Sequence, residues 1–175
     1  MKDKRISDIM YIRSPVESSD SKIGFLPGDV DEKLQFYNLP FIDKLEELLS
    51  KAQIETLKNQ ERIKIHPLSF VRGMSWNCKS IILDEAQNCT MKEIVTLMTR
   101  VGQFSKCFIL ADPDQTDLPT GKSGGFDKLK TIFNDDESRA NGIYSFEFTE
   151  EDIKRSELVK FMVKKLKHLA PALRV

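Results

Sequence analysis

The 175-residue sequence lacks any apolar run that approaches the roughly 18 residues needed to cross a lipid bilayer. Its N-terminus also lacks the apolar stretch of a secretory signal. Neither sign of charge is in excess, with 27 basic and 27 acidic residues, which argues against a strongly basic nucleic-acid binder and against an acidic tail. Cysteine is scarce: Cys78, Cys89 and Cys107 match no zinc spacing, so we expect reduced thiols. These absences predict a cytoplasmic protein without a membrane anchor.

Length and composition fit one globular domain. Apolar residues make up 40% of the chain and charged residues 31%, which argues against wholesale disorder. A chain of this length can bury a substantial core. We therefore expect residues 1–175 to form a single domain, in which 167–175 are a C-terminal tail.

The order of the apolar segments predicts the fold class. Short strand-like segments alternate with segments of helical periodicity. The expected strands lie at 9–12, 62–65, 80–83, 107–111 and 143–148. The expected helices lie at 41–49, 52–60, 91–101, 126–133 and from 156 onward. This order is typical of an α/β fold with a parallel sheet and helices on both faces.

Local signals predict where helices begin and which side chains they bury. Pro40 is expected to separate two helical stretches, with Asn38 as the N-cap of the second. Thr90 and Glu93 have the spacing of a capping box. In the last helix, a set of apolar residues is expected to face the core: Leu158, Phe161, Met162, Leu166 and Leu169.

Two adjacent carboxylates, Asp84 and Glu85, follow the expected strand 80–83. Ligands of parallel sheets bind beyond the carboxyl ends of the strands. Neighbouring carboxylates repel each other unless something offsets their charge, and a magnesium ion would do so. In phosphoryl transfer the first acid would anchor the ion, and the second would orient or activate the attacking water. The alternative interpretation is an acidic turn that caps the next helix.

A second polar segment, Asp112-Pro113-Asp114-Gln115, follows the expected strand 107–111. A glutamine in this place could form hydrogen bonds with both a γ-phosphate oxygen and the attacking water. The alternative is a polar turn that Asp112 and Pro113 initiate. Two polar strand ends in one chain favour the interpretation as a nucleotide site.

Several motifs together resemble one family. The segment LDEAQN resembles the Walker B element of superfamily 1 helicase-like ATPases. More closely, the chain resembles the PhoH family of P-loop ATPases from about Ile9 to Leu166. The matching segments, in the family's order, are RSPVE (13–17), GFLPGD (24–29), IILDEAQNCT (81–90), LMTRVG (97–102), DPDQTDLPTGKSG (112–124) and FTEEDIKRSELV (148–159).

The resemblance implies a magnesium-dependent ATP hydrolase with a RecA-like or helicase-like P-loop fold. Asp84 would then hold Mg²⁺, directly or through water, and Glu85 would activate the attacking water. Gln115 would sense the γ-phosphate of ATP. Asp112 matches the acid of the second strand end, where this chain has Ala111 and the family usually has glycine.

Three arginines complete the set of site residues that the resemblance implies. Arg155 corresponds to an arginine that reaches the γ-phosphate in helicase-like relatives. Arg100 could be supplied to a neighbouring subunit, and Arg13 at a strand end could contact phosphate or nucleic acid. The alternative for Arg155 and Arg100 is an ordinary solvated arginine near a helix end.

One element of the family pattern is not found. Other P-loop ATPases carry G-x-x-x-x-G-K-[ST] upstream of the segment that matches Arg13, but the residues before Ile9 contain no glycine. We therefore expect a P-loop fold that is missing its first strand and its phosphate loop, which a partner could supply. The alternative to an enzyme is a non-catalytic binding or assembly subunit, or a remnant.

The expected macromolecular partners also come from the resemblance, which implies coupling to RNA or single-stranded nucleic acid in a ring-like homo-oligomer. From Lys154 to Val175 the chain has seven Lys and Arg residues and one acid, Glu157. Such a segment could follow a nucleic-acid backbone. A solvated helix face is the interpretation that we favour.

Overall fold

A computed structural model describes residues 6–13, 30–116, 118, 124–149, 152, 154 and 156–166. The chain divides into two compact units, Met1–Leu129 and Lys130–Val175. The first unit contains the sheet and every described residue of the expected nucleotide site. The expectation of a single domain stays a prediction. No helix in the described part of the chain is both long and apolar enough to span a bilayer.

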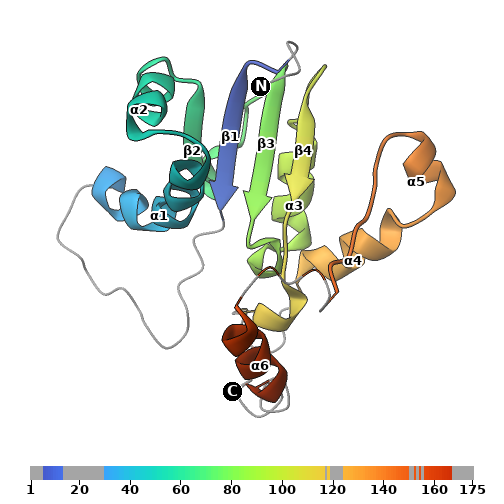
Figure 1. Cartoon of the computed structure of the whole chain (residues 1–175). Helices are drawn as coiled ribbons and strands as arrows, with labels where there is room; N and C mark the ends of the chain where they lie inside the picture. The colour runs from blue at the N-terminus through green and yellow to red at the C-terminus, as the bar shows by residue number, and fades with distance from the viewer. Residues whose placement is uncertain are drawn as a thin grey trace. The chain divides into compact units, whose positions relative to one another are not determined.

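The first unit is built on a four-stranded sheet with the order β2-β1-β3-β4, in which every pair is parallel. Its strands are β1 (Asp8–Arg13), β2 (Ile63–Pro67), β3 (Lys79–Asp84) and β4 (Lys106–Ile109). Four of the five expected strands are therefore confirmed. Because all four strands are parallel, their carboxyl ends lie at one edge of the sheet (Figure 1).

Helices connect these strands, and the expected α/β class is confirmed. The helices α1 (Val30–Leu48) and α2 (Lys51–Asn59) lie between β1 and β2 in the chain, and α3 (Met91–Met98) lies between β3 and β4. In the view of Figure 1, α3 lies behind β3 and β4. The capping box of Thr90 and Glu93 is present at the start of α3, as expected.

The expected break at Pro40 was wrong, because Pro40 lies inside a continuous α1. Proline removes one backbone donor from a helix but does not by itself separate its turns. Packing after Pro40 holds the helix together: Leu45 is buried with Ile54 of α2 and Ile63 of β2. The chain breaks later, at Ser50, which forms the capping box of α2.

The strand β1 is covered on both faces. Met10, Tyr11 and Ile12 are all at most 3% exposed, although successive side chains of a strand point to opposite faces. On one face, the Tyr11 ring stacks on Phe41 of α1 with centroids 4.3 Å apart and an interplanar angle of 8°. Such double coverage is typical of parallel sheets. This packing holds β1 in place between its two covering layers.

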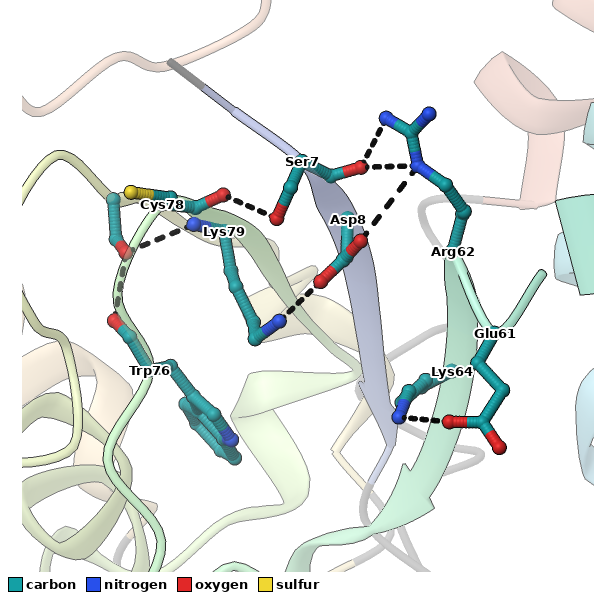
Figure 2. Close-up of polar contacts among 9 residues, drawn as sticks. Ser7, Asp8, Glu61, Arg62, Lys64, Trp76, Cys78 and Lys79 are labelled. Atoms are coloured by element: carbon teal, nitrogen blue, oxygen red, sulfur yellow. Dashed lines mark hydrogen bonds and ion pairs between the residues drawn. The ribbon is translucent and has the colours of Figure 1, made fainter.

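A charged network joins β1 to its two neighbours at the opposite edge of the sheet (Figure 2). The Asp8 carboxylate forms an ion pair with Lys79 of β3, and its Oδ1 lies 3.7 Å from Arg62 Nε, just before β2. Arg62 Nε also donates to the Ser7 carbonyl oxygen at 2.7 Å. Burial alone would raise the pKa of Asp8, but hydrogen bonds from Lys79 and Ser7 and the charges of Lys79 and Arg62 outweigh it and lower that pKa.

The second unit contains two elements that differ from the sequence expectation. Residues 143–148 form no strand, and Tyr144, Phe146 and Phe148 are 63–84% exposed. A strand requires a neighbour that accepts its backbone hydrogen bonds, and no described strand pairs with this segment. The expected strand at 143–148 was therefore wrong, because the alternating pattern does not reveal whether a neighbouring strand is present.

The last helix is present as α6 (Glu157–Leu166), but the expected burial of its apolar face was wrong. Leu158, Phe161 and Met162 are 43–67% exposed. Amphipathic spacing predicts a face that can pack, but not that a partner covers it. The Leu166 side chain and Leu169 lie outside the described part of the chain.

Replacing Asp8 with Asn should lower the free energy of unfolding by about 1–2 kcal/mol at neutral pH, because Lys79 and Arg62 lose the carboxylate that they face. Since the pKa of folded Asp8 lies below its ordinary value of 3.8, this contribution exists above that pH and disappears as the pH falls through the folded pKa. Urea unfolding at pH 7 and at a series of lower pH values would measure both effects.

The matched control for this substitution is Glu61→Gln. Glu61 pairs with Lys64 at 2.8 Å, but its side chain is 77% exposed. Solvent screens such a pair, so the control should show no measurable loss of stability. Equal losses for the two variants would contradict a special role for Asp8.

Candidate functional site

The candidate site begins where β1 and β3 end side by side. The register of the sheet pairs Arg13 with Asp84, the last residues of these two strands. Glu85 follows immediately and adopts a left-handed conformation, with φ 55° and ψ 40°. This conformation is uncommon for residues other than glycine and is often found at functional sites. It turns the chain sharply at the edge of the sheet.

The Asp84 carboxylate is held by two donors. Tyr11 Oη donates to Asp84 Oδ2 at 2.5 Å, and the Glu85 backbone N–H donates to Asp84 Oδ1 at 3.0 Å. Burial, together with the hydrogen bond to Asp84, raises the pKa of Tyr11 well above its ordinary value. Tyr11 therefore remains a protonated donor to this carboxylate at physiological pH.

The Glu85 carboxylate is held by two other side chains. Its Oε1 accepts a hydrogen bond from Arg13 Nη2 at 3.0 Å, and its Oε2 accepts one from Gln87 Nε2 at 2.7 Å. The repulsion between Asp84 and Glu85 is thus offset by protein groups, whereas the sequence pattern suggested magnesium for this role. The acids also do not cap α3, because Thr90 does so.

The second polar strand end lies against the first. Asp112 precedes a 3₁₀ turn at Pro113–Gln115, and the Gln115 side chain donates back to Asp112 Oδ2 at 2.8 Å. The Gln115 side chain is therefore hydrogen-bonded to Asp112. The backbone carbonyl oxygen of Gln115 accepts a hydrogen bond from Gln87 Nε2 at 3.2 Å. The structure brings Asp84, Glu85 and this turn to the same edge of the sheet.

One of the implied arginines, Arg100, lies at the other end of the sheet. The Arg100 carbonyl accepts a hydrogen bond from the Trp76 N–H at 2.9 Å, which places it before the start of β3, at the opposite end from Asp84. Its Nε is buried without a hydrogen-bond partner among the described residues. Arg155 lies outside the described residues.

The donor set fits a metal ion only if other groups supply most of its ligands. No cluster of three or more His, Cys, Asp or Glu side chains that could hold a metal occurs in the described part of the chain. Magnesium commonly takes one or two carboxylates and completes its shell with water and phosphate oxygens. Asp84, with its carboxylate at the end of a strand, fits that mode of binding.

Sequence reasoning missed Tyr11 and Gln87 as site residues. Tyr11 was placed in a strand, and Gln87 was only one letter of the LDEAQN segment. The parallel register of β1 and β3 brings Tyr11 to Asp84, although 73 positions separate them in the chain. No pattern in the sequence indicated that the Gln87 side chain would be buried.

Burial and the hydrogen bond to Asp84 raise the pKa of Tyr11, so the Tyr11→Phe variant and the unmodified protein should show the same phenolate absorbance change up to about pH 11. The measurement is the absorbance change of phenolate near 295 nm, compared between the two folded proteins. Circular dichroism would confirm that both stay folded over the titration. A smaller ionisation amplitude in the variant would show that Tyr11 titrates normally and is not held by Asp84.

Comparison with known proteins identifies relatives of this chain. The family model described as "PhoH-like protein" matches residues 1–167. A PhoH-like protein of Bacillus subtilis is 36% identical over 159 residues, which is 91% of this chain and 48% of that protein. A PhoH-like protein of Synechocystis is 32% identical over 156 residues, covering 89% of this chain and 46% of that protein.

A third relative, Protein PhoH of Escherichia coli K12, is 32% identical over 153 residues, covering 86% of this chain and 42% of that protein. The chain thus spans somewhat less than half the length of these curated relatives. The family model covers nearly all of the present sequence, including both polar strand ends. On this evidence the chain belongs to the PhoH-like protein family.

Proposed function

We propose that this chain forms part of a magnesium-dependent ATP-hydrolysing unit. The observation that supports the proposal is the placement of Asp84, Glu85 and the 112–115 turn at one carboxyl edge of a parallel sheet. Ligands of parallel α/β sheets bind at this edge. Adjacent acids here, next to a polar turn on the neighbouring strand, suit phosphoryl transfer.

Each residue has a definite task in this proposal. Asp84 would hold the magnesium ion, which when bound supplies positive charge to the phosphates of the nucleotide. Glu85 would accept a proton from the attacking water through a carboxylate lone pair that is not used by Arg13 or Gln87. The Gln115 side chain would turn from Asp112 toward the γ-phosphate.

The phosphate loop would come from a segment outside this sequence. We place its strand beside β4, which pairs only with β3 among the described residues. Phe108 of β4 and the following Leu110 are both 48% exposed, and the helix that follows the phosphate loop would cover this face, since both faces of a parallel sheet are normally covered by helices. The relatives are about twice as long as the matched region and so have residues that could fill this place.

The proposal includes RNA or single-stranded nucleic acid as the coupled substrate and a ring-like homo-oligomer as the working form. In such a ring, Arg100 of one subunit would serve its neighbour, which suits its distance from Asp84 in its own subunit. Arg155 would contact the γ-phosphate.

The isolated chain should hydrolyse ATP far more slowly than the roughly 1 s⁻¹ of a working ATPase. Without the oriented backbone N–H groups and lysine of a phosphate loop, it lacks most of the contacts to the β- and γ-phosphates. A phosphate-release assay on the purified chain with magnesium would test this. Turnover near 1 s⁻¹ that depends on magnesium would show that the phosphate loop is dispensable.

Adding a G-x-x-x-x-G-K-[ST] segment from a full-length relative, by fusion or by mixing, should restore magnesium-dependent hydrolysis. In the restored protein, Glu85→Gln should lower kcat at least about 100-fold with little change in ATP binding, since the amide has a similar shape but cannot accept the proton. Phosphate release and equilibrium binding of ATP would be measured on the same samples.

The control for this experiment is Glu55→Gln, on the exposed surface of α2, which should retain full turnover. Equal activity of the Glu85→Gln variant and the unmodified protein would remove Glu85 from the mechanism. A restored protein that folds and binds nucleotide without any turnover would favour a non-catalytic binding or assembly subunit.

A further inference from the structure

A buried glutamine, Gln87, lies between the two polar strand ends. It belongs to the 3₁₀ turn Ala86–Asn88 and is only 4% exposed. Glutamine is rarely buried to this degree, and a buried amide is costly unless its polar atoms are paired.

The Gln87 amide makes three hydrogen bonds that join segments far apart in the chain. Its Nε2 donates to Glu85 Oε2 at 2.7 Å and to the Gln115 carbonyl oxygen at 3.2 Å. Its Oε1 accepts a hydrogen bond from the Asp112 backbone N–H at 3.1 Å. Both amide hydrogens of Gln87 thus have acceptors, and its amide oxygen accepts a hydrogen bond from the segment that follows β4.

These partners determine the orientation of the amide. If the amide were rotated by half a turn, its NH₂ group would face the Asp112 N–H, and its oxygen would face the Glu85 carboxylate. Both contacts would be repulsive, so only the observed orientation satisfies all three partners.

The backbone around Gln87 leaves little freedom to shift. The Ala86 N–H donates to the Leu110 carbonyl oxygen at 2.9 Å, which holds the turn to the segment after β4. A Cβ atom on Gly124 would lie 2.8 Å from the Gln87 carbonyl oxygen, so the returning chain passes very close to the turn. Gln87 is therefore fixed on both its backbone and its side chain.

We propose that Gln87 is a positioning residue that couples the orientation of the Glu85 carboxylate to the position of the 112–115 turn. If Glu85 leaves Gln87, a buried amide hydrogen loses its acceptor, and the amide can recover a partner only by moving relative to Asp112 and Gln115. The two strand ends consequently move together. The consequence for catalysis rests on the proposed ATPase function, whereas the coupling itself does not.

The coupling can be measured on the chain alone by NMR of the Asp112 and Gln115 backbone amides. Glu85→Ala should shift both resonances in the otherwise unmodified protein. In a Gln87→Met background, which lacks all three hydrogen bonds, the same Glu85→Ala change should leave both resonances in place. Hydrogen exchange at the Asp112 amide should also become roughly tenfold faster in Gln87→Met.

A second variant keeps the test valid if Gln87→Met does not fold. Gln87→Glu keeps an acceptor for Asp112 but places a second carboxylate against Glu85, so it should retain the slow exchange at Asp112 and lose the coupling. Gln103→Glu, on an exposed turn, is the matched control for charge and should preserve the coupling. Equal shifts caused by Glu85→Ala with and without Gln87, or no shift in either, would overturn the proposal.

Activity of the restored protein separates this proposal from the proposed function. There, Gln87→Glu should lower kcat about 10- to 100-fold while KM for ATP stays nearly constant, because a positioning defect acts on the reacting carboxylate. NMR coupling without any turnover in the restored protein would reject the ATPase and leave the coupling intact. Turnover that is insensitive to Gln87→Glu would reject the role of Gln87 in catalysis.

Discussion

The repulsion between two adjacent carboxylates is the constraint on which the candidate site depends. Asp84 is the last residue of β3 and Glu85 follows it directly, after the apolar segment Ile81–Leu83, and both acids are only partly exposed to water. Protein donors offset this repulsion: Tyr11 for Asp84, and Arg13 and Gln87 for Glu85. These side chains come from β1 and from the turn after β3. The negative charge of the two acids therefore requires hydrogen-bond donors at the end of the neighbouring strand β1.

The parallel sheet makes this compensation possible. In the observed register Arg13 is the partner of Asp84, so a cation at the end of β1 reaches the acids after β3. Tyr11, two residues earlier, points to the same face and is fixed by its stacking on Phe41. A shift of one residue in the pairing would send both side chains to the other face. The packing of α1 on β1 is thus connected directly to the chemistry at the edge of the sheet.

The sequence predicted local features well and long-range contacts poorly. The four strands of the sheet, the capping box at Thr90 and the pair of acids follow from patterns within a few residues, and the structure contains them. Residues 143–148 have the alternation of a strand, but pairing depends on a neighbour that periodicity cannot reveal. The expected burial of the apolar face of α6 was wrong for the same reason, since helical periodicity does not reveal whether another element covers that face. The roles of Tyr11 and Gln87 require the register and the turn geometry, which no single segment encodes.

The central claim is that Arg13 directly offsets the charge of Glu85. A double-mutant cycle with Arg13→Met, Glu85→Gln and the combined variant, unfolded by urea in the presence of a chelator, measures this interaction alone. The two side chains are 26% and 34% exposed, so solvent weakens the pair, and we predict a coupling free energy of about 1 kcal/mol. A coupling free energy indistinguishable from zero would contradict the account.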